Sequence, residues 1–291
     1  MQVVIHAGAH FTDEDRLINC LTANQNRLSE IGTDVPAPDA YRKLLRDILN
    51  TATKTGVSNE ARDVVLEAVS HDPGSDRLVL SNQGFFGTPK MAVGQGQLYP
   101  AAEIRLEAFR QIFAQDQLEL FLALRNPATY LPALFARSRM DSVADFLNGH
   151  EPAAFRWSEC VGRIRAAFPD MPITIWCNED SPLIWAQIVR EMGGLDPTAE
   201  FDGEFSLLSE IMTAAGMKRF RSYLDSHPGM TEVQKRRVIA AFLDKFVRED
   251  EIEEELDLPG WTEDLVDQLS DLYDEDIFDV QRVPGINMIT T

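Results

Sequence analysis

The chain has 291 residues, of which 44% are hydrophobic and 25% are charged, and its formal net charge is −20. These fractions are typical of a globular protein and not of a disordered or fibrous chain. The charge argues against nucleic acid or an anionic membrane as a partner, and no apolar run approaches the ~18–20 residues that cross a bilayer.

Four strands are predicted from short runs rich in Val, Ile, Leu or Phe, at residues 2–7, 77–81, 118–124 and 172–177. The helices expected between and after them begin near residues 12, 40, 60, 101, 127, 158 and 181. Strands that alternate with helices predict the α/β class, here a three-layer α/β/α fold with a mainly parallel sheet, a central first strand and additional C-terminal helices. We interpret residues 1–291 as a single domain whose part 206–291 is mainly helical and acidic.

Acidic residues are concentrated at 249–279, where fifteen Asp and Glu occur without a Lys or Arg. Within this segment Leu265, Leu269 and Tyr273 follow Thr262 at helical spacing, which predicts a capped amphipathic helix with solvated acids on its other faces. A weak calcium site is the alternative, but the spacing of an EF-hand is absent. We expect the basic residues 235–237 to counter the acidic segment.

The three cysteines, Cys20, Cys160 and Cys177, are widely spaced and form no CxxC pair. An odd number of scattered cysteines predicts neither a disulfide framework nor a structural zinc site, so we expect a reducing, cytoplasmic environment and no metal. The first residues lack the basic and long apolar regions of a signal peptide.

Ligands of parallel α/β sheets bind outside the carboxyl ends of the strands. Here these ends are residues 8–12, 81–84, 125–127 and 177–181. At the first of them a glycine lies between a strand and a helix, an arrangement in which backbone amides bind phosphate, so Gly8, Ala9 and Thr12 are candidate anion-binding residues. Residues 82–99 are rich in glycine and lack periodicity, which predicts a functional or mobile loop.

Residues 6–17 (HAGAHFTDEDRL) resemble the loop H-x-G-x-x-K-T-G-T-T-x-L of the sulfotransferase family of P-loop proteins, with His6, Gly8, Thr12 and Leu17 in register. The resemblance implies a P-loop-like sheet and the transfer of a sulfuryl group from 3′-phosphoadenylyl sulfate. The acceptor would be a hydroxyl of a carbohydrate or small molecule.

Two further segments carry the resemblance. Residues 125–130 (RNPATY) are similar to the family's motif that binds the 3′-phosphate of the donor, which implies that role for Arg125. Residues 80–87 (LSNQGFFG) are similar to the strand end near the acceptor pocket. A salt bridge from Arg125 to a C-terminal acid is the structural alternative.

The same segments depart from the family pattern at charged positions. Phe11 stands at the loop lysine, residues 13–15 (DED) replace Gly-Thr-Thr, and Ala133 replaces a serine that contacts the 3′-phosphate. Two hypotheses follow. Either Thr12 and Asp15 form a capping box that fills the loop, or the donor still binds with Arg16, Arg125 or Lys90 as the missing cation.

His10 is the candidate catalytic acid or base, because an unperturbed histidine titrates near neutrality. A structural role is its alternative. Gln83, at the strand end, cannot act as a base. The function expected is therefore a sulfotransferase-like enzyme if active, or otherwise a catalytically impaired relative that binds a ligand or partner. Oligomeric state and acceptor identity stay open.

Overall fold

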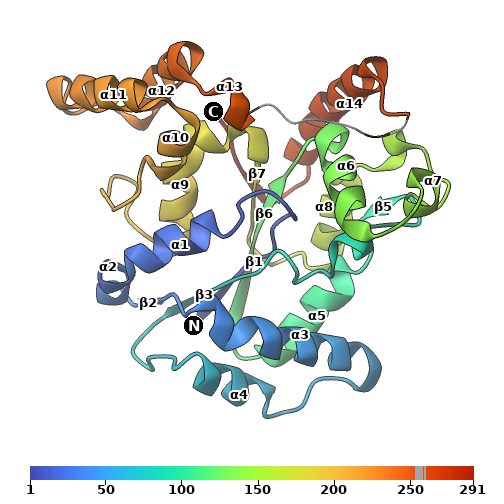
Figure 1. The fold of residues 1–291 in the computed structure, drawn as a ribbon. Coiled ribbons are helices and arrows are strands. Elements are labelled where there is room, and N and C mark those ends of the chain that lie inside the picture. The colour runs from blue at the N-terminus through green and yellow to red at the C-terminus, as the bar shows by residue number, and fades with distance from the viewer. Residues whose placement is uncertain (253–257, 259) are drawn as a thin grey trace.

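The computed structural model describes residues 1–252, 258 and 260–291, with the side chains at 53–55 and 252 outside that description. A parallel six-stranded sheet lies between two layers of helices (Figure 1). The predicted three-layer α/β/α class is therefore confirmed.

The order of strands in the sheet is β2-β3-β1-β6-β7-β8, and every neighbouring pair is parallel. The strands are β1 Gln2–His6, β2 Thr33–Asp34, β3 Arg77–Ser81, β6 Gln117–Leu124, β7 Ile173–Cys177 and β8 Ile286–Ile289. In the register, His6 pairs with Ser81 of β3 on one side and with Phe121 of β6 on the other. The first strand is thus central, as predicted, and its carboxyl end is flanked by those of β3 and β6.

The two faces of β1 enter different apolar clusters. Val3 and Ile5 pack with Tyr41 and other residues of one helical layer, whereas Val4 packs with Leu17 and residues of the opposite layer. Because a central parallel strand is buried on both faces, its sequence shows a continuous apolar run without polar alternation.

The first layer contains α1 Arg16–Ala23, α2 Gln25–Glu30 and α9 Ser181–Gly193. The second contains α3 Pro38–Thr55, α4 Ala61–Ala68, α5 Ala102–Ile112, α6 Pro127–Ser138, α7 Val143–Phe146, α8 Trp157–Ala167 and α14 Glu263–Gln281. The remaining helices are α10 Ser206–Ile211, α11 Ala214–Ser226, α12 Glu232–Phe246 and α13 Glu249–Ile252. Figure 1 shows α11 and α12 lying beyond α10, away from the sheet.

The segment 82–99 is more ordered than its glycine content predicts. It contains the 3-10 turn η1 Pro89–Met91 and a hairpin of β4 Val93–Gly94 and β5 Gln97–Leu98. Phe85, Phe86 and Tyr99 are buried in the main core, so large apolar anchors hold the segment at both ends.

The acidic helix confirms one prediction and corrects another. The hydroxyl of Thr262 accepts the backbone N–H of Leu265 at 3.3 Å, and Leu269 and Tyr273 are buried. The expected counter-charge from residues 235–237 is wrong for Lys235, which pairs with Glu204 and Glu232 outside the acidic segment. Positions 253–257 and 259 of the acidic segment lie outside the described residues.

Along the described residues, no helix combines the length and apolar character needed to cross a membrane. The three cysteines are buried and unpaired. Within the same residues, no group of three or more His, Cys, Asp and Glu side chains is placed to hold a metal ion.

Candidate functional site

The loop after β1 lies where the carboxyl ends of β1, β3 and β6 meet. Gly8, the second residue after the end of β1, has φ of +96°, which L side chains rarely adopt. A Cβ at this position would lie 3.2 Å from Cα of Gln83 and 3.1 Å from the nitrogen of His10. Glycine is therefore required both by the turn and by the close approach of the loop after β3.

The candidate residues Gly8 and Ala9 use their polar backbone groups within the sheet. The N–H of Ala9 donates to the carbonyl of Ala123 at 3.1 Å, and the carbonyl of Gly8 accepts the N–H of Ala123 at 2.7 Å. These contacts extend the β1–β6 pairing past the end of β1. The Ala9 N–H therefore donates to the protein backbone and not to a ligand.

The next two amides are occupied by side chains from other elements. The N–H of His10 donates to the hydroxyl of Tyr99 at 2.9 Å, and the N–H of Phe11 donates to Oε1 of Gln83 at 3.0 Å. A phosphate cradle presents such amides to its ligand. Here they are satisfied from within the protein.

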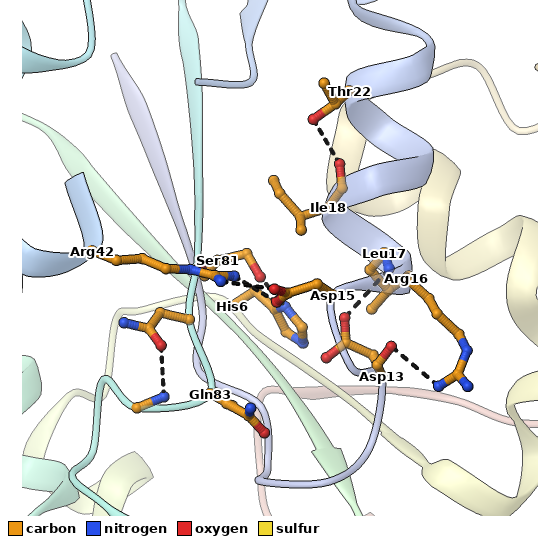
Figure 2. Close-up of polar contacts among 12 residues, drawn as sticks. His6, Asp13, Asp15, Arg16, Leu17, Ile18, Thr22, Arg42, Ser81 and Gln83 are labelled. Atoms are coloured by element: carbon orange, nitrogen blue, oxygen red, sulfur yellow. Dashed lines mark hydrogen bonds and ion pairs between the residues drawn. The ribbon is translucent and has the colours of Figure 1, made fainter. Parts of the chain in front are cut away.

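The helix after the loop begins later than predicted, and the expected capping box is wrong. α1 begins at Arg16 rather than near Thr12, and the Thr12 hydroxyl donates to the carbonyl of Ala9 at 2.8 Å. A carboxylate of Asp13 accepts the N–H of Leu17 at 3.3 Å (Figure 2). An acid does fill the helix N-terminus, but it is Asp13, because Asp15 is drawn to a different partner.

That partner is Arg42 of α3. Its two terminal nitrogens lie 2.8 and 2.6 Å from the carboxylate oxygens of Asp15, and its Nε donates to the carbonyl of Ser81 at 3.0 Å. The hydrogen bonds from Arg42 hold the pKa of Asp15 below its usual range. The pair therefore joins the loop after β1 to α3 and to the end of β3.

Three residues of this loop other than glycine, Phe11, Glu14 and Asp15, have positive φ values of 57°, 46° and 67°. This left-handed region costs energy for L residues, and such residues cluster at functional sites. The Asp15–Arg42 pair and the Phe11–Gln83 bond hold two of the three in place.

His6 lies beneath the loop, at the end of β1. The residue is 1% exposed, its Nδ1 is 2.8 Å from the hydroxyl of Ser81, and its Nε2 finds no hydrogen-bond partner in the part of the chain that the structure describes. Burial lowers the pKa of His6, against the opposing field of Asp13 and Asp15. Figure 2 shows the ring beside these two carboxylates.

The candidate catalytic residue His10 is 2% exposed and belongs to a chain of hydrogen bonds. Its Nε2 is 3.1 Å from the carbonyl oxygen of Gly87, which can only accept a hydrogen bond, so Nε2 carries the proton. The unprotonated Nδ1 then accepts a hydrogen bond from the hydroxyl of Tyr99 at 2.7 Å. The Tyr99 oxygen in turn lies 2.7 Å from that of Tyr130. Burial lowers the pKa of His10 to about 4, so the ring is neutral at pH 7 with both nitrogens engaged.

The two candidate arginines point in different directions. Arg125 is 7% exposed at the end of β6, and its Nη1 donates to the carbonyl of Phe11 at 2.8 Å. Its Nε lies 3.2 Å from the hydroxyl of Thr129. Arg16 pairs with Glu210 of α10 at 2.6 Å, on the side of the loop opposite Arg42 in Figure 2. The structure thus brings Arg125 to the middle of the loop, while Arg16 lies at its acidic end, where Nη1 is 3.4 Å from the carbonyl of Asp13 and 3.5 Å from the carboxylate of Glu14.

Four residues that organise this site were not predicted to do so. Tyr99, Gln83 and Arg42 supply the contacts described above, and Glu179 accepts the N–H of Asn126 at 2.8 Å beside the end of β6. The resemblance located the strand end that carries Gln83, but no local pattern pairs Asp15 with a residue 27 positions away.

A scan against protein-family models and a search of curated proteins each found no match to this chain.

Proposed function

We propose that this protein is a sulfotransferase-like α/β protein that binds a ligand at the carboxyl edge of its sheet without transferring a sulfuryl group. One observation carries the proposal: side chains of the protein already occupy the amides that a phosphate would use in the loop after β1 and at the start of α1. Tyr99, Gln83 and Asp13 take the N–H groups of His10, Phe11 and Leu17.

The charges around the loop support the same proposal. Sulfuryl transfer, like phosphoryl transfer, needs cations that neutralise charge on the transferred group. Here Phe11 stands where the resemblance implies a lysine, and Asp13 and Asp15 lie at the start of α1. Two unit charges ~4 Å apart interact by about 4 kcal/mol at an effective dielectric constant near 20, which would weaken binding of a phosphate roughly a thousandfold. The residues present do not fit the phosphates of 3′-phosphoadenylyl sulfate.

The competing function is an active sulfotransferase. Its support is Arg125, a buried guanidinium at the end of a central strand and in contact with the loop. Activity would require the carboxylate of Asp13 and the amide of Gln83 to leave the backbone groups they now occupy.

Calorimetric titration with 3′,5′-adenosine bisphosphate separates the two functions. We expect no binding heat from the wild-type protein at millimolar nucleotide. Binding is expected in the variant Phe11→Lys with Asp13→Gly, because it adds a cation and frees the N–H of Leu17.

A variant with the same charge change, Ile31→Lys with Glu30→Gly, controls for non-specific attraction, because both residues are exposed on α2 and its C-terminal cap. Micromolar binding by the wild type that Arg125→Ala abolishes would support the active enzyme instead. Failure of the loop variant to bind would show that this loop is not a displaced phosphate site.

A further inference from the structure

A cavity of about 570 Å³ lies beside the loop, between α3, α5 and the segment that follows β3. It adjoins the site described above, since His10, Phe11 and Gln83 line one part of its wall. The cavity is large enough for a small organic molecule.

The charge of the cavity wall is opposite to that of the whole chain. Its charged lining residues are the four cations Arg42, Lys43, Arg46 and Arg105 and a single carboxylate, Asp39. The chain as a whole carries −20. A basic cavity in so acidic a protein attracts anions to one place on its surface.

Arg105 is the unusual member of this group. It is 7% exposed, its Nη2 donates to Oδ1 of Asn50 at 2.7 Å, and its Nε has no hydrogen-bond partner among the described residues. Among the residues that the structure describes, no carboxylate lies within ion-pair distance of it. Burial without a compensating charge lowers the pKa of Arg105.

A buried guanidinium without a counter-charge is costly for a folded protein. Arg190, another buried arginine, is compensated by Glu204 and Glu232. Arg42, on the same cavity wall as Arg105, is compensated by Asp15. Of these three, Arg105 has no anionic partner among the described residues, and an anionic ligand in the cavity would supply one.

The remaining wall defines the rest of that ligand. Pro89 and Met91 contribute accessible apolar surface next to the cations, above the buried Leu49 and Phe85. Phosphate, sulfate and carboxylate groups all suit a guanidinium, and the apolar wall suits an aromatic or aliphatic body.

We propose that this cavity binds a small amphipathic organic anion, with its phosphate, sulfate or carboxylate group on Arg105 and Lys43 and its apolar body against Pro89 and Met91. The inference rests on the binding function proposed above and names the class of ligand. It uses no contact with the loop amides, so it is independent of whether a nucleotide binds there.

Calorimetry with three probes of one ring system tests the charge requirement. We expect 1-naphthyl phosphate and 1-naphthoate to bind the wild-type protein at least tenfold more tightly than neutral 1-naphthol. Comparison of the two anions shows which head group the cavity prefers. Equal affinity for 1-naphthol would overturn the proposal.

Arg105→Met should lower the affinity for 1-naphthyl phosphate at least tenfold while leaving the melting temperature unchanged or higher, because it removes an uncompensated buried charge. Arg110→Gln, an exposed position on the same helix, is the matched control and should bind as the wild type does. A structural arginine would instead give a lower melting temperature and unchanged affinity, and that result would refute the site.

Lys43→Gln keeps the test decisive if Arg105→Met does not fold, since Lys43 is exposed on α3. We expect about threefold weaker binding of 1-naphthyl phosphate. No change would overturn the placement of the anionic group. The two proposals can fail separately. If 3′,5′-adenosine bisphosphate binds, and Asp13→Gly changes its affinity while Arg105→Met does not, the proposed function is contradicted and the cavity proposal is left intact.

Discussion

At the scale of single residues, the site is dominated by groups whose charge is controlled by burial. His10 is neutral because desolvation outweighs the hydrogen bond to Gly87. Asp15 stays ionised because two nitrogens of Arg42 bind its carboxylate. Both residues lie in the loop after β1, but their partners lie elsewhere: Tyr99 follows β5, and Arg42 belongs to α3. The charge states of the two side chains therefore depend on tertiary contacts and not on the loop sequence alone.

His10 makes stability depend on pH. Between the unfolded pKa of 6.5 and the folded value of about 4, the unfolded chain binds a proton that the folded protein does not, so stability falls as the pH is lowered. From pH 7 to pH 5 this single group should cost about 2 kcal/mol. Urea denaturation of the wild type and His10→Phe at both pH values measures the difference. An equal loss in the two proteins would show that His10 is protonated in the folded state.

At the scale of elements, one helix caps another. Asp276 of α14 is 2% exposed and accepts the N–H of Trp157 at 2.6 Å and that of Ser158 at 3.3 Å, at the start of α8. The sequence predicts solvated acids on this helix, and Asp276 is an exception, because it is buried and accepts the first amides of a helix more than a hundred residues earlier.

Asp276→Ala should lower the free energy of unfolding by about 2–3 kcal/mol, because it leaves buried amides of α8 without an acceptor. Asp274→Ala, an exposed acid on the same helix, should change it by no more than about 0.5 kcal/mol. Chemical denaturation measures both. Equal effects would mean that the general acidity of α14, and not the cap, determines its contribution.

At the scale of the whole molecule, the described residues form two large apolar clusters on the faces of the sheet and a small third one in α10–α12. Phe220 is the buried centre of the third cluster and contacts Phe205 and Phe242 edge to face. Because these helices pack beyond α9 and not on the sheet, their local unfolding should require less free energy than that of β1 or β6.

Amide hydrogen exchange tests this difference. In the wild type we expect the slowest exchange in β1 and β6. Phe220→Ala should speed exchange of α11 and α12 by at least tenfold without changing β1, whereas Phe109→Ala, in the main core, should speed exchange throughout. A uniform response to Phe220→Ala would show that the protein unfolds as one cooperative unit.

The sequence by itself determined the α/β class and four of the six strands of the sheet. β1, β3, β6 and β7 are apolar runs buried on both faces, and such runs are visible without any partner. β2 spans two residues and β8 four, so both are too short to be recognised as strands from an apolar run. The sequence also located Gly8 and Arg125 at strand ends that do meet.

Only the tertiary structure decided what those strand ends do. The residues that fill the loop, Gln83 and Tyr99, and the residue that binds Asp15, Arg42, come from separate elements that the sheet order brings together. The environment of Arg105 is also a product of the tertiary structure. Its sequence neighbours do not reveal that it is buried and that no described carboxylate lies within ion-pair distance of it. The apolar pattern of a segment is enough to predict its secondary structure. The partner of a charged or polar side chain depends on which segments the fold packs side by side.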